Sequence, residues 1–315
     1  MTRRVVLVVA TVVLASSCAG SDGGDRGDRQ PQAAELIATV ASYDLAADLD
    51  TRFIVGLQTA ANRLVAGGRV DMRFFFLGET RAEGEPELLG QATAEFLPLP
   101  DSAAPDTPGP VEVEPSESRG VYSVSSVSFD RPGIWEVEVT ADFGGGDVRT
   151  ATNAFQVLPE HQVPAPGDRA LRTENLTVDS DAPPRAIDSR AQGGGAIPDE
   201  VLHRTTIADA IRAGRPIVAV FATPVYCVSK FCGPVTDMVQ ELSDDYGGRA
   251  EFIHVEIWRD FQGRVVNRAA AEWLLRNEDL QEPWVFAVGA NGRIEERWDN
   301  VATREEIEPW LERLP

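Results

Sequence analysis

Residues 222–238 read ATPVYCVSKFCGPVTDM and contain two cysteines, Cys227 and Cys232, separated by four residues. They follow PIVAVFAT (216–223), a continuous apolar and β-branched run that predicts a strand buried on both faces. They precede GPVTDMVQELSDDYG (233–247), which predicts a helix with proline at its first position and an apolar stripe on one face. The cysteine pair is therefore expected where a buried strand meets the helix that follows it.

The same alternation continues through the last part of the chain, 201–315. Further helices are predicted at 205–216, at 269–277 and over the C-terminal ATREEIEPWLERL, and further strands at 251–258, 284–288 and 293–298. The last two strands flank Asn291-Gly292, a dipeptide typical of a hairpin turn. The predicted order is βα, βα, ββα.

A different pattern fills residues 35–158. GIWEVEV (133–139) places Trp135, Val137 and Val139 on one side and glutamates on the other, the period-two pattern of a half-buried strand. Seven such runs lie at 35–40, 52–57, 70–77, 92–97, 121–129, 133–139 and 149–158. Because turn-rich segments separate them and no amphipathic helix intervenes, we predict a two-sheet sandwich. FDRPGIWEV (129–137) resembles the turn and strand of bacterial immunoglobulin-like domains.

Residues 1–18 have the composition of a targeting segment. Arg3 and Arg4 precede an apolar stretch too short to span a bilayer. Small residues then lead into Cys18, which resembles a bacterial lipoprotein signal whose cysteine is lipidated. Residues 19–34 predict a flexible tether, and 159–200 a Pro- and Gly-rich linker. We therefore expect a lipid-anchored protein on the extracytoplasmic face of the cell membrane, where disulfides persist.

Composition excludes several functions. With 43% hydrophobic and 25% charged residues the chain is globular, and a formal net charge of −21 argues against a nucleic-acid surface. The chain has no phosphate loop, nucleophile elbow or zinc-protease helix. With Cys18 assigned to the anchor, Cys227 and Cys232 are each other's only possible disulfide partners. A structural zinc site would need four ligands, and the chain has no second cysteine pair to supply them. We expect no cofactor and no metal.

Two local motifs resemble thioredoxin. Phe231-Cys232-Gly233-Pro234-Val235 is similar to the thioredoxin motif Trp-Cys-Gly-Pro-Cys, and Pro283 precedes a strand where thioredoxin-like proteins carry a cis-proline. The resemblance implies a two-domain fold: an immunoglobulin-like β-sandwich at 35–158 and an α/β thioredoxin-like (redoxin or Sco-type) fold at 201–315. It also implies that Pro283 faces the cysteines.

The cysteine spacing restricts the local geometry. Positions i and i+5 of a regular helix lie ~140° apart around its axis, so both cysteines cannot be helical and form a disulfide. We therefore predict Gly233 as the N-cap, with the preceding residues as a loop that brings the sulfurs together. A thiolate beside a helix N-terminus is stabilised there, and Lys230 is a candidate to add to the effect. We favour Cys227 as nucleophile and Cys232 as the resolving thiol.

Three functions follow from this pair. The first is a thiol–disulfide oxidoreductase acting on exported thiol or disulfide proteins or on small thiols. The second is a binding protein in which the disulfide is structural. The third is copper handling, because FATPVYCVSKFC loosely resembles the cysteine loop of the Sco copper chaperones and thiolates suit Cu(I). That family adds a histidine from a late loop, whereas His254 lies in a predicted strand, where we expect a packed residue.

Overall fold

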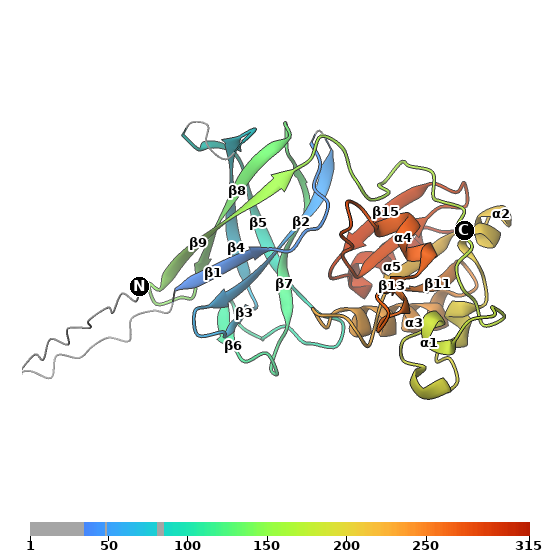
Figure 1. The fold of residues 1–315 in the computed structure, drawn as a ribbon. Helices are drawn as coiled ribbons and strands as arrows, with labels where there is room; N and C mark the ends of the chain where they lie inside the picture. Colours follow the sequence, from blue (N-terminus) through green and yellow to red (C-terminus); the bar gives the residue numbers. More distant parts are fainter. Residues whose placement is uncertain (1–34, 48, 81–84) are drawn as a thin grey trace, which may run out of the picture. The chain divides into compact units, whose positions relative to one another are not determined.

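The computed structural model describes residues 35–47, 49–80 and 85–315 (Figure 1). The predicted signal, the anchor at Cys18 and the tether to residue 34 lie outside the described residues. Ala34–Pro315 forms one compact unit. Within the described residues, no helix has both the length and the hydropathy needed to cross a membrane.

In the part of the chain that the structure describes, nine strands precede the first helix. They are β1 (Leu36–Val40), β2 (Asp50–Thr59), β3 (Leu64–Ala66), β4 (Arg69–Gly78), β5 (Glu87–Pro98), β6 (Val111–Val113), β7 (Gly120–Ser128), β8 (Gly133–Asp142) and β9 (Val148–Val157). The seven predicted runs coincide with the seven longer or regularly alternating strands. The sequence analysis missed β3 and β6, because three residues are too few to show a period.

The remaining elements mix helices and strands. They are α1 (Pro184–Ile187), η1 (Gln192–Gly194), η2 (Glu200–His203), α2 (Ile207–Arg212), β10 (Ile217–Ala222), α3 (Cys232–Tyr246), β11 (Glu251–Glu256), β12 (Trp258–Asp260), β13 (Val265–Val266), α4 (Arg268–Leu274), β14 (Trp284–Val288), β15 (Ile294–Asp299) and α5 (Arg304–Glu312). At the start of α5 the Thr303 backbone N–H donates to Glu306 Oε2 at 3.2 Å.

The predicted fold class is wrong. The chain is mainly β, with 39% strand and 17% helix, and its large sheets are antiparallel, so an α/β thioredoxin-like fold at 201–315 is not supported. Among the ladders between described strands only β10 and β11 run parallel. The helices of this part are mostly short: α2 has six residues and α4 has seven. Alternation along the sequence indicated the element types but not how their strands pair.

The two-sheet sandwich is also not what the strands form. All nine belong to one antiparallel sheet of order β6-β3-β2-β7-β5-β4-β8-β9, with β1 added beside β2. The reason is the 12-residue β5, which pairs with β4 up to Glu95 and from Glu95 onward with β7. One continuous strand thus joins what would otherwise be two sheets, and the sheet curls around a shared core (Figure 1).

Aromatic side chains dominate that core. Trp135, Val137 and Val139 of β8 point inward as their alternation predicts, and each is at most 1% exposed. Phe129 packs edge-to-face against Trp135 at 5.0 Å and against Phe74 at 5.6 Å between ring centroids. Burying large aromatic side chains supplies much of the hydrophobic stabilisation of such a domain.

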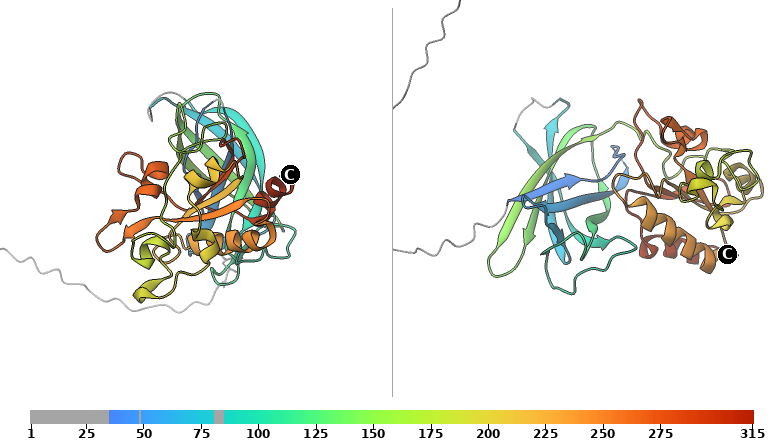
Figure 2. Two further views of the ribbon diagram at one scale, coloured as in Figure 1. Left: turned by 90° about the vertical axis from the view of Figure 1, so that its right-hand side faces the viewer. Right: turned by 60° about the horizontal axis from the view of Figure 1, so that its bottom comes forward.

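The second sheet has the order β11-β10-β14-β15, with β10 and β14 fully buried in its centre. Helices cover both of its faces. The apolar sides of α3 and α5 pack on one face and lie side by side (Figure 2), and those of α2 and α4 pack on the other. This two-sided burial explains the unbroken apolar run of β10.

The segment 159–200 contains little regular structure, in line with its composition, yet several of its polar side chains are buried. The Trp273 indole N–H donates to Thr173 Oγ1 at 2.9 Å, and the Ile207 backbone N–H donates to Asn175 Oδ1 at 2.8 Å. Asp188 is 0% exposed. The segment therefore packs against the second sheet and its helices and contributes polar groups to the interior.

Candidate functional site: a dithiol at the start of helix α3

The cysteines lie where β10 gives way to α3. The strand ends at Ala222, a turn follows in which the Cys227 N–H donates to the Thr223 carbonyl at 3.1 Å, and the helix begins at Cys232. The N-cap is Phe231, not Gly233, so the predicted helix start was two residues late. Because Phe231 offers no side-chain acceptor, the first backbone N–H groups of α3 are free to face the Cys227 sulfur.

The two thiols are close but unbonded. Both cysteines are free, and their sulfurs lie within 4.8 Å of each other and of a carboxylate oxygen of Glu282. Cys232 is 0% exposed, whereas Cys227 is half-buried in a loop whose Val228 is 95% exposed. Cys227 is therefore the more accessible of the two cysteines. The sequence analysis predicted a loop that brings the sulfurs together; they lie near each other, and no disulfide joins them.

The surroundings separate the acidities of the thiols. Hydrogen bonds from Cys232, Ser229 and the backbone N–H groups at the helix start outweigh burial and lower the pKa of Cys227 to about 5. Ser229 Oγ lies 3.2 Å from the sulfur. Burial, followed by the neighbouring Cys227 thiolate, raises the pKa of Cys232 far above its ordinary value. At neutral pH the outer sulfur is a thiolate and the inner one is a thiol.

Glu282 is a site residue that the sequence analysis missed. Burial, then the charge on Cys227 and that on Glu256, raises the pKa of its carboxyl to about 7. Its peptide bond to the buried Pro283 is cis, and the Tyr43 hydroxyl donates to its carbonyl at 2.9 Å. The available signal was adjacency: Glu282 immediately precedes the proline that had already been placed near the cysteines.

Lys230 was a candidate from the sequence to help stabilise the thiolate, and the groups named above as lowering the pKa of Cys227 do not include it. It is exposed, at a φ of 62° in the loop, and none of the described residues forms an ion pair or hydrogen bond with it. The groups that lower the pKa of Cys227 are neighbouring side-chain and backbone hydrogen-bond donors. The local backbone stabilises the thiolate without a cationic side chain.

The histidines lie apart from the thiols. His203 and His254 are buried on either side of Asp188, 3.3 and 3.4 Å from its carboxylate, and form a separate cluster with it. His161 lies 2.8 Å from an Arg297 nitrogen. The dithiol therefore has a carboxylate as its third neighbour where a Sco-type copper site needs a histidine. As expected, His254 is a packed strand residue.

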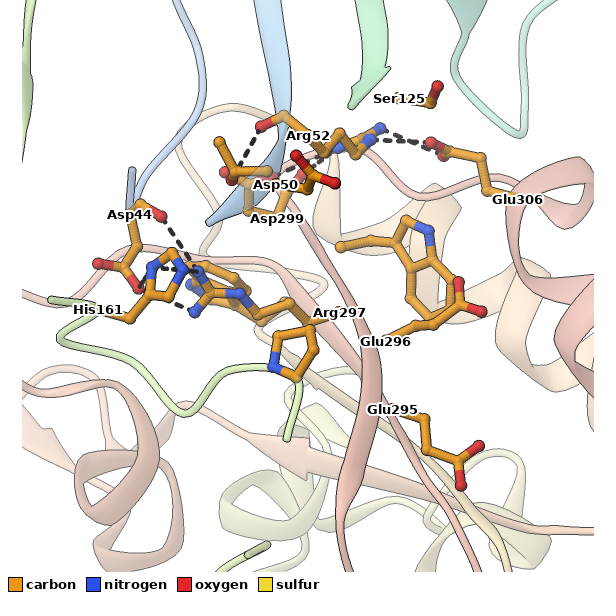
Figure 3. Close-up of a pocket in the computed structure, with 14 residues that line it drawn as sticks. Asp44, Asp50, Arg52, Ser125, His161, Glu295, Glu296, Arg297, Asp299 and Glu306 are labelled. Carbon is orange, nitrogen blue, oxygen red and sulfur yellow. Dashed lines mark hydrogen bonds and ion pairs between the residues drawn. The ribbon is translucent and has the colours of Figure 1, made fainter. Parts of the chain in front are cut away.

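In a polar pocket elsewhere in the structure, the charged side chains that line it form ion pairs with one another. Its two arginines point toward carboxylates: Arg52 toward Asp299 and Glu306, and Arg297 toward Asp44 (Figure 3). Both arginine side chains are at most 9% exposed. Since each buried charge already has a partner, the lining of this pocket is explained by internal ion pairing.

Comparison with known proteins identifies no family. No family model and no curated protein matches the chain. The sporulation control protein Spo0M from Bacillus subtilis aligns over 40% of this chain and 49% of its own at 10% identity and a TM-score of 0.24. A β-glucosidase from Kluyveromyces marxianus aligns over 40% of this chain and 14% of its own at 13% identity and a TM-score of 0.20. Similarities this weak carry no argument about fold or function.

Proposed function

We propose that the chain is a thiol–disulfide oxidoreductase in which Cys227 is the nucleophile and Cys232 the resolving thiol. One observation carries the proposal: an accessible sulfur and a buried sulfur lie within 4.8 Å of each other at the start of a helix, with pKa values shifted in opposite directions. A structural pair needs neither the exposure of Cys227 nor its ionisation. Such shifts are typical of reactive thiols.

The first step is attack by the Cys227 thiolate on a substrate disulfide, R–S–S–R′. The Cys227 Sγ–S bond forms as the substrate S–S bond breaks, and R′–S⁻ departs and takes a proton from solvent. The hydrogen-bond donors at Ser229 and at the start of α3 hold the thiolate ready for this attack. Because Cys232 is buried, a large substrate reaches only the outer sulfur.

The second step releases the substrate. Cys232 must lose its proton before it can attack the Cys227 sulfur, and Glu282 is the nearby base: burial, the largest cause of its raised carboxyl pKa, persists when Cys227 is in the mixed disulfide. The new Cys227–Cys232 bond expels R–S⁻, which takes the second proton. The substrate disulfide gains two electrons and becomes two thiols, while the protein dithiol loses two and becomes a disulfide. The reverse sequence oxidises a dithiol substrate.

The proposed substrates are exported proteins or small thiols. The basic and apolar pattern of residues 1–18, ending at Cys18, supports export and lipid anchoring outside the cytoplasm. Disulfides form and exchange in that compartment. The membrane-tethered location thus belongs to the same proposal as the chemistry.

The disulfide potential tests the proposal. The full chain is equilibrated in glutathione buffers of graded ratio, and its dithiol fraction is measured by alkylation and mass spectrometry. A redox-active pair should titrate within the range of known oxidoreductases, ~−120 to −270 mV. A potential below ~−300 mV indicates a structural disulfide and refutes the proposal.

Trapping identifies the attacking sulfur. Cys232→Ser retains the proposed nucleophile but cannot resolve, so it should accumulate a mixed disulfide with a small disulfide or an exported protein. Cys227→Ser is the matched control and should trap nothing, because its remaining thiol is buried. If the second variant traps partners and the first does not, the assignment of roles is reversed.

A further inference from the structure

A buried polar cluster lies beside the dithiol loop and has no part in the mechanism above. Asp188, which follows α1, and His203 at the end of η2 are each 0% exposed, and His254 of β11 is 1% exposed. The two imidazoles lie side by side, with ring centroids 5.1 Å apart, and Asp188 Oδ2 contacts both, 3.3 Å from His203 Nε2 and 3.4 Å from His254 Nδ1. Keeping these groups from water is costly unless their arrangement has a compensating role.

Hydrogen-bond geometry determines the charge of His254. Its Nε2 lies 3.1 Å from the Ala222 carbonyl, which can only accept, so Nε2 carries a hydrogen. Nδ1 lies 3.4 Å from Asp188 Oδ2 without forming a hydrogen bond, so in a neutral ring its lone pair would sit beside a carboxylate that is also an acceptor. A second proton on Nδ1 turns this repulsion into an attraction between opposite charges. This arrangement favours the imidazolium form of His254.

The groups around His254 agree with that assignment. Burial alone would lower the pKa of His254, but Asp188, with Glu256 and the Ala222 carbonyl, outweighs it and raises the pKa. Burial lowers the pKa of His203, which leaves it neutral and donating from Nε2 to Asp188. The other charge facing the cluster is Arg190, whose Nη2 lies 2.7 Å from Asp188 Oδ2. Burial raises the pKa of Glu256.

A metal ion fits this cluster less well than a proton. Arg190 already occupies Asp188 Oδ2, the atom that faces both histidines. A metal-bound histidine ordinarily donates its second ring N–H to an acceptor, and His203 Nδ1 has no hydrogen-bond partner. With Nε2 protonated instead, His203 Nδ1 is a bare acceptor, and this ring leaves no donor unpaired.

The cluster is connected to both ends of the segment that precedes Cys227. Ala222, which accepts from His254, is the last residue of β10. Ser189, next to Asp188, accepts from the Val225 N–H at 3.2 Å, and its own N–H donates to Glu256 at 2.8 Å. The cluster thus holds Ala222 and Val225, on either side of Thr223, whose carbonyl accepts from the Cys227 N–H.

We propose that Asp188 is a positioning residue for the dithiol: it holds a protonated His254 that anchors the end of β10, while its neighbour Ser189 anchors the cysteine turn. This inference rests on the proposed function. It adds that Asp188 and Ser189, residues of the segment 159–200, determine the reactivity of Cys227 without touching it.

The test uses Asp188→Asn in the full chain, with two readouts. Imidazole ¹⁵N and ¹H shifts should show His254 doubly protonated at neutral pH in the parent protein and neutral in the variant. The rate of Cys227 with a small disulfide should fall ~10-fold, since misplacing a reacting group by ~1 Å costs up to ~10²-fold. Asp237→Asn is the matched control, because Asp237 also pairs with Arg190 but is 65% exposed and leaves both readouts unchanged.

Each remaining outcome decides the inference. A neutral His254 in the parent protein, or a Cys227 rate unchanged in a folded Asp188→Asn, overturns it. If that variant does not fold, Ser189→Ala serves instead: it should lower the Cys227 rate while His254 stays charged, and an unchanged rate refutes the positioning role. If the parent protein fails to exchange disulfides, the proposed function falls. The positioning role is then decided by the His254 shifts and the alkylation rate of Cys227.

Discussion

Replacing Cys232 by alanine should make Cys227 a weaker acid. The hydrogen bond from Cys232 is the largest of the effects that lower the pKa of Cys227 to about 5. Alanine removes it, while Ser229 and the backbone donors at the start of α3 remain. Cys232→Ser is the matched control, because its hydroxyl still donates to the thiolate.

The size of the change follows from the hydrogen bond. A hydrogen bond to a charged acceptor is worth ~1.5–3 kcal/mol, and ~1.4 kcal/mol corresponds to one pH unit. The alanine variant should therefore raise the pKa of Cys227 by ~1–2 pH units, toward the lower end because Cys227 is partly exposed. The serine variant should shift by much less.

The assay is the rate of alkylation of Cys227 by iodoacetamide from pH 4 to pH 10, read by mass spectrometry. At pH 5 an ordinary thiol is only ~0.03% ionised, whereas Cys227 is about half ionised. The lower nucleophilicity of an acidic thiolate cancels part of this ~10³-fold gain, which leaves Cys227 ~40-fold faster than the same thiol in unfolded protein. An inflection near pH 8.5 in the parent protein, or equal shifts in both variants, contradicts the reasoning.

Three further predictions concern single side chains. Glu282→Gln removes the proposed base and should slow resolution of a trapped mixed disulfide by up to ~10²-fold in a quench assay, whereas Glu278→Gln, an exposed control, should not. Asp44→Asn leaves a buried arginine unpaired and should cost ~3–5 kcal/mol in denaturant unfolding. Because the pKa of Asp44 is lowered to about 2, its contribution is present above its unfolded value and is lost as pH falls toward 2. Trp135→Ala should lower the free energy of unfolding by ~3–5 kcal/mol. A loss of less than a third of that amount contradicts the place of Trp135 in the core.

Local patterns in the sequence predicted most elements of the chain. Alternation at 133–139 located β8 and its buried face, because a strand with one face in a core must alternate. The apolar run at 216–223 located β10. Each of these signals lies within a few residues of the feature it predicts.

These local patterns could not predict which strands, distant in the sequence, would pair in a sheet. The sandwich prediction failed because β5 changes partner at Glu95, and nothing in its sequence marks the change. The fold-class prediction failed for a related reason: helix and strand order does not say which strands run parallel. Strand pairing is decided by the packing of the whole core.

The sequence by itself determined that Cys227 and Cys232 would lie between a buried strand and a helix, since periodicity and proline placement are local properties. Only the tertiary structure decided their chemistry. Glu282 lies beside the two sulfurs although it is 50 residues after Cys232 in the sequence. Asp188 contacts His254 and belongs to the segment 159–200, which the sequence analysis predicted to be a linker. Burial and charge depend on neighbours that are distant in sequence, and so do the acidities of the two thiols.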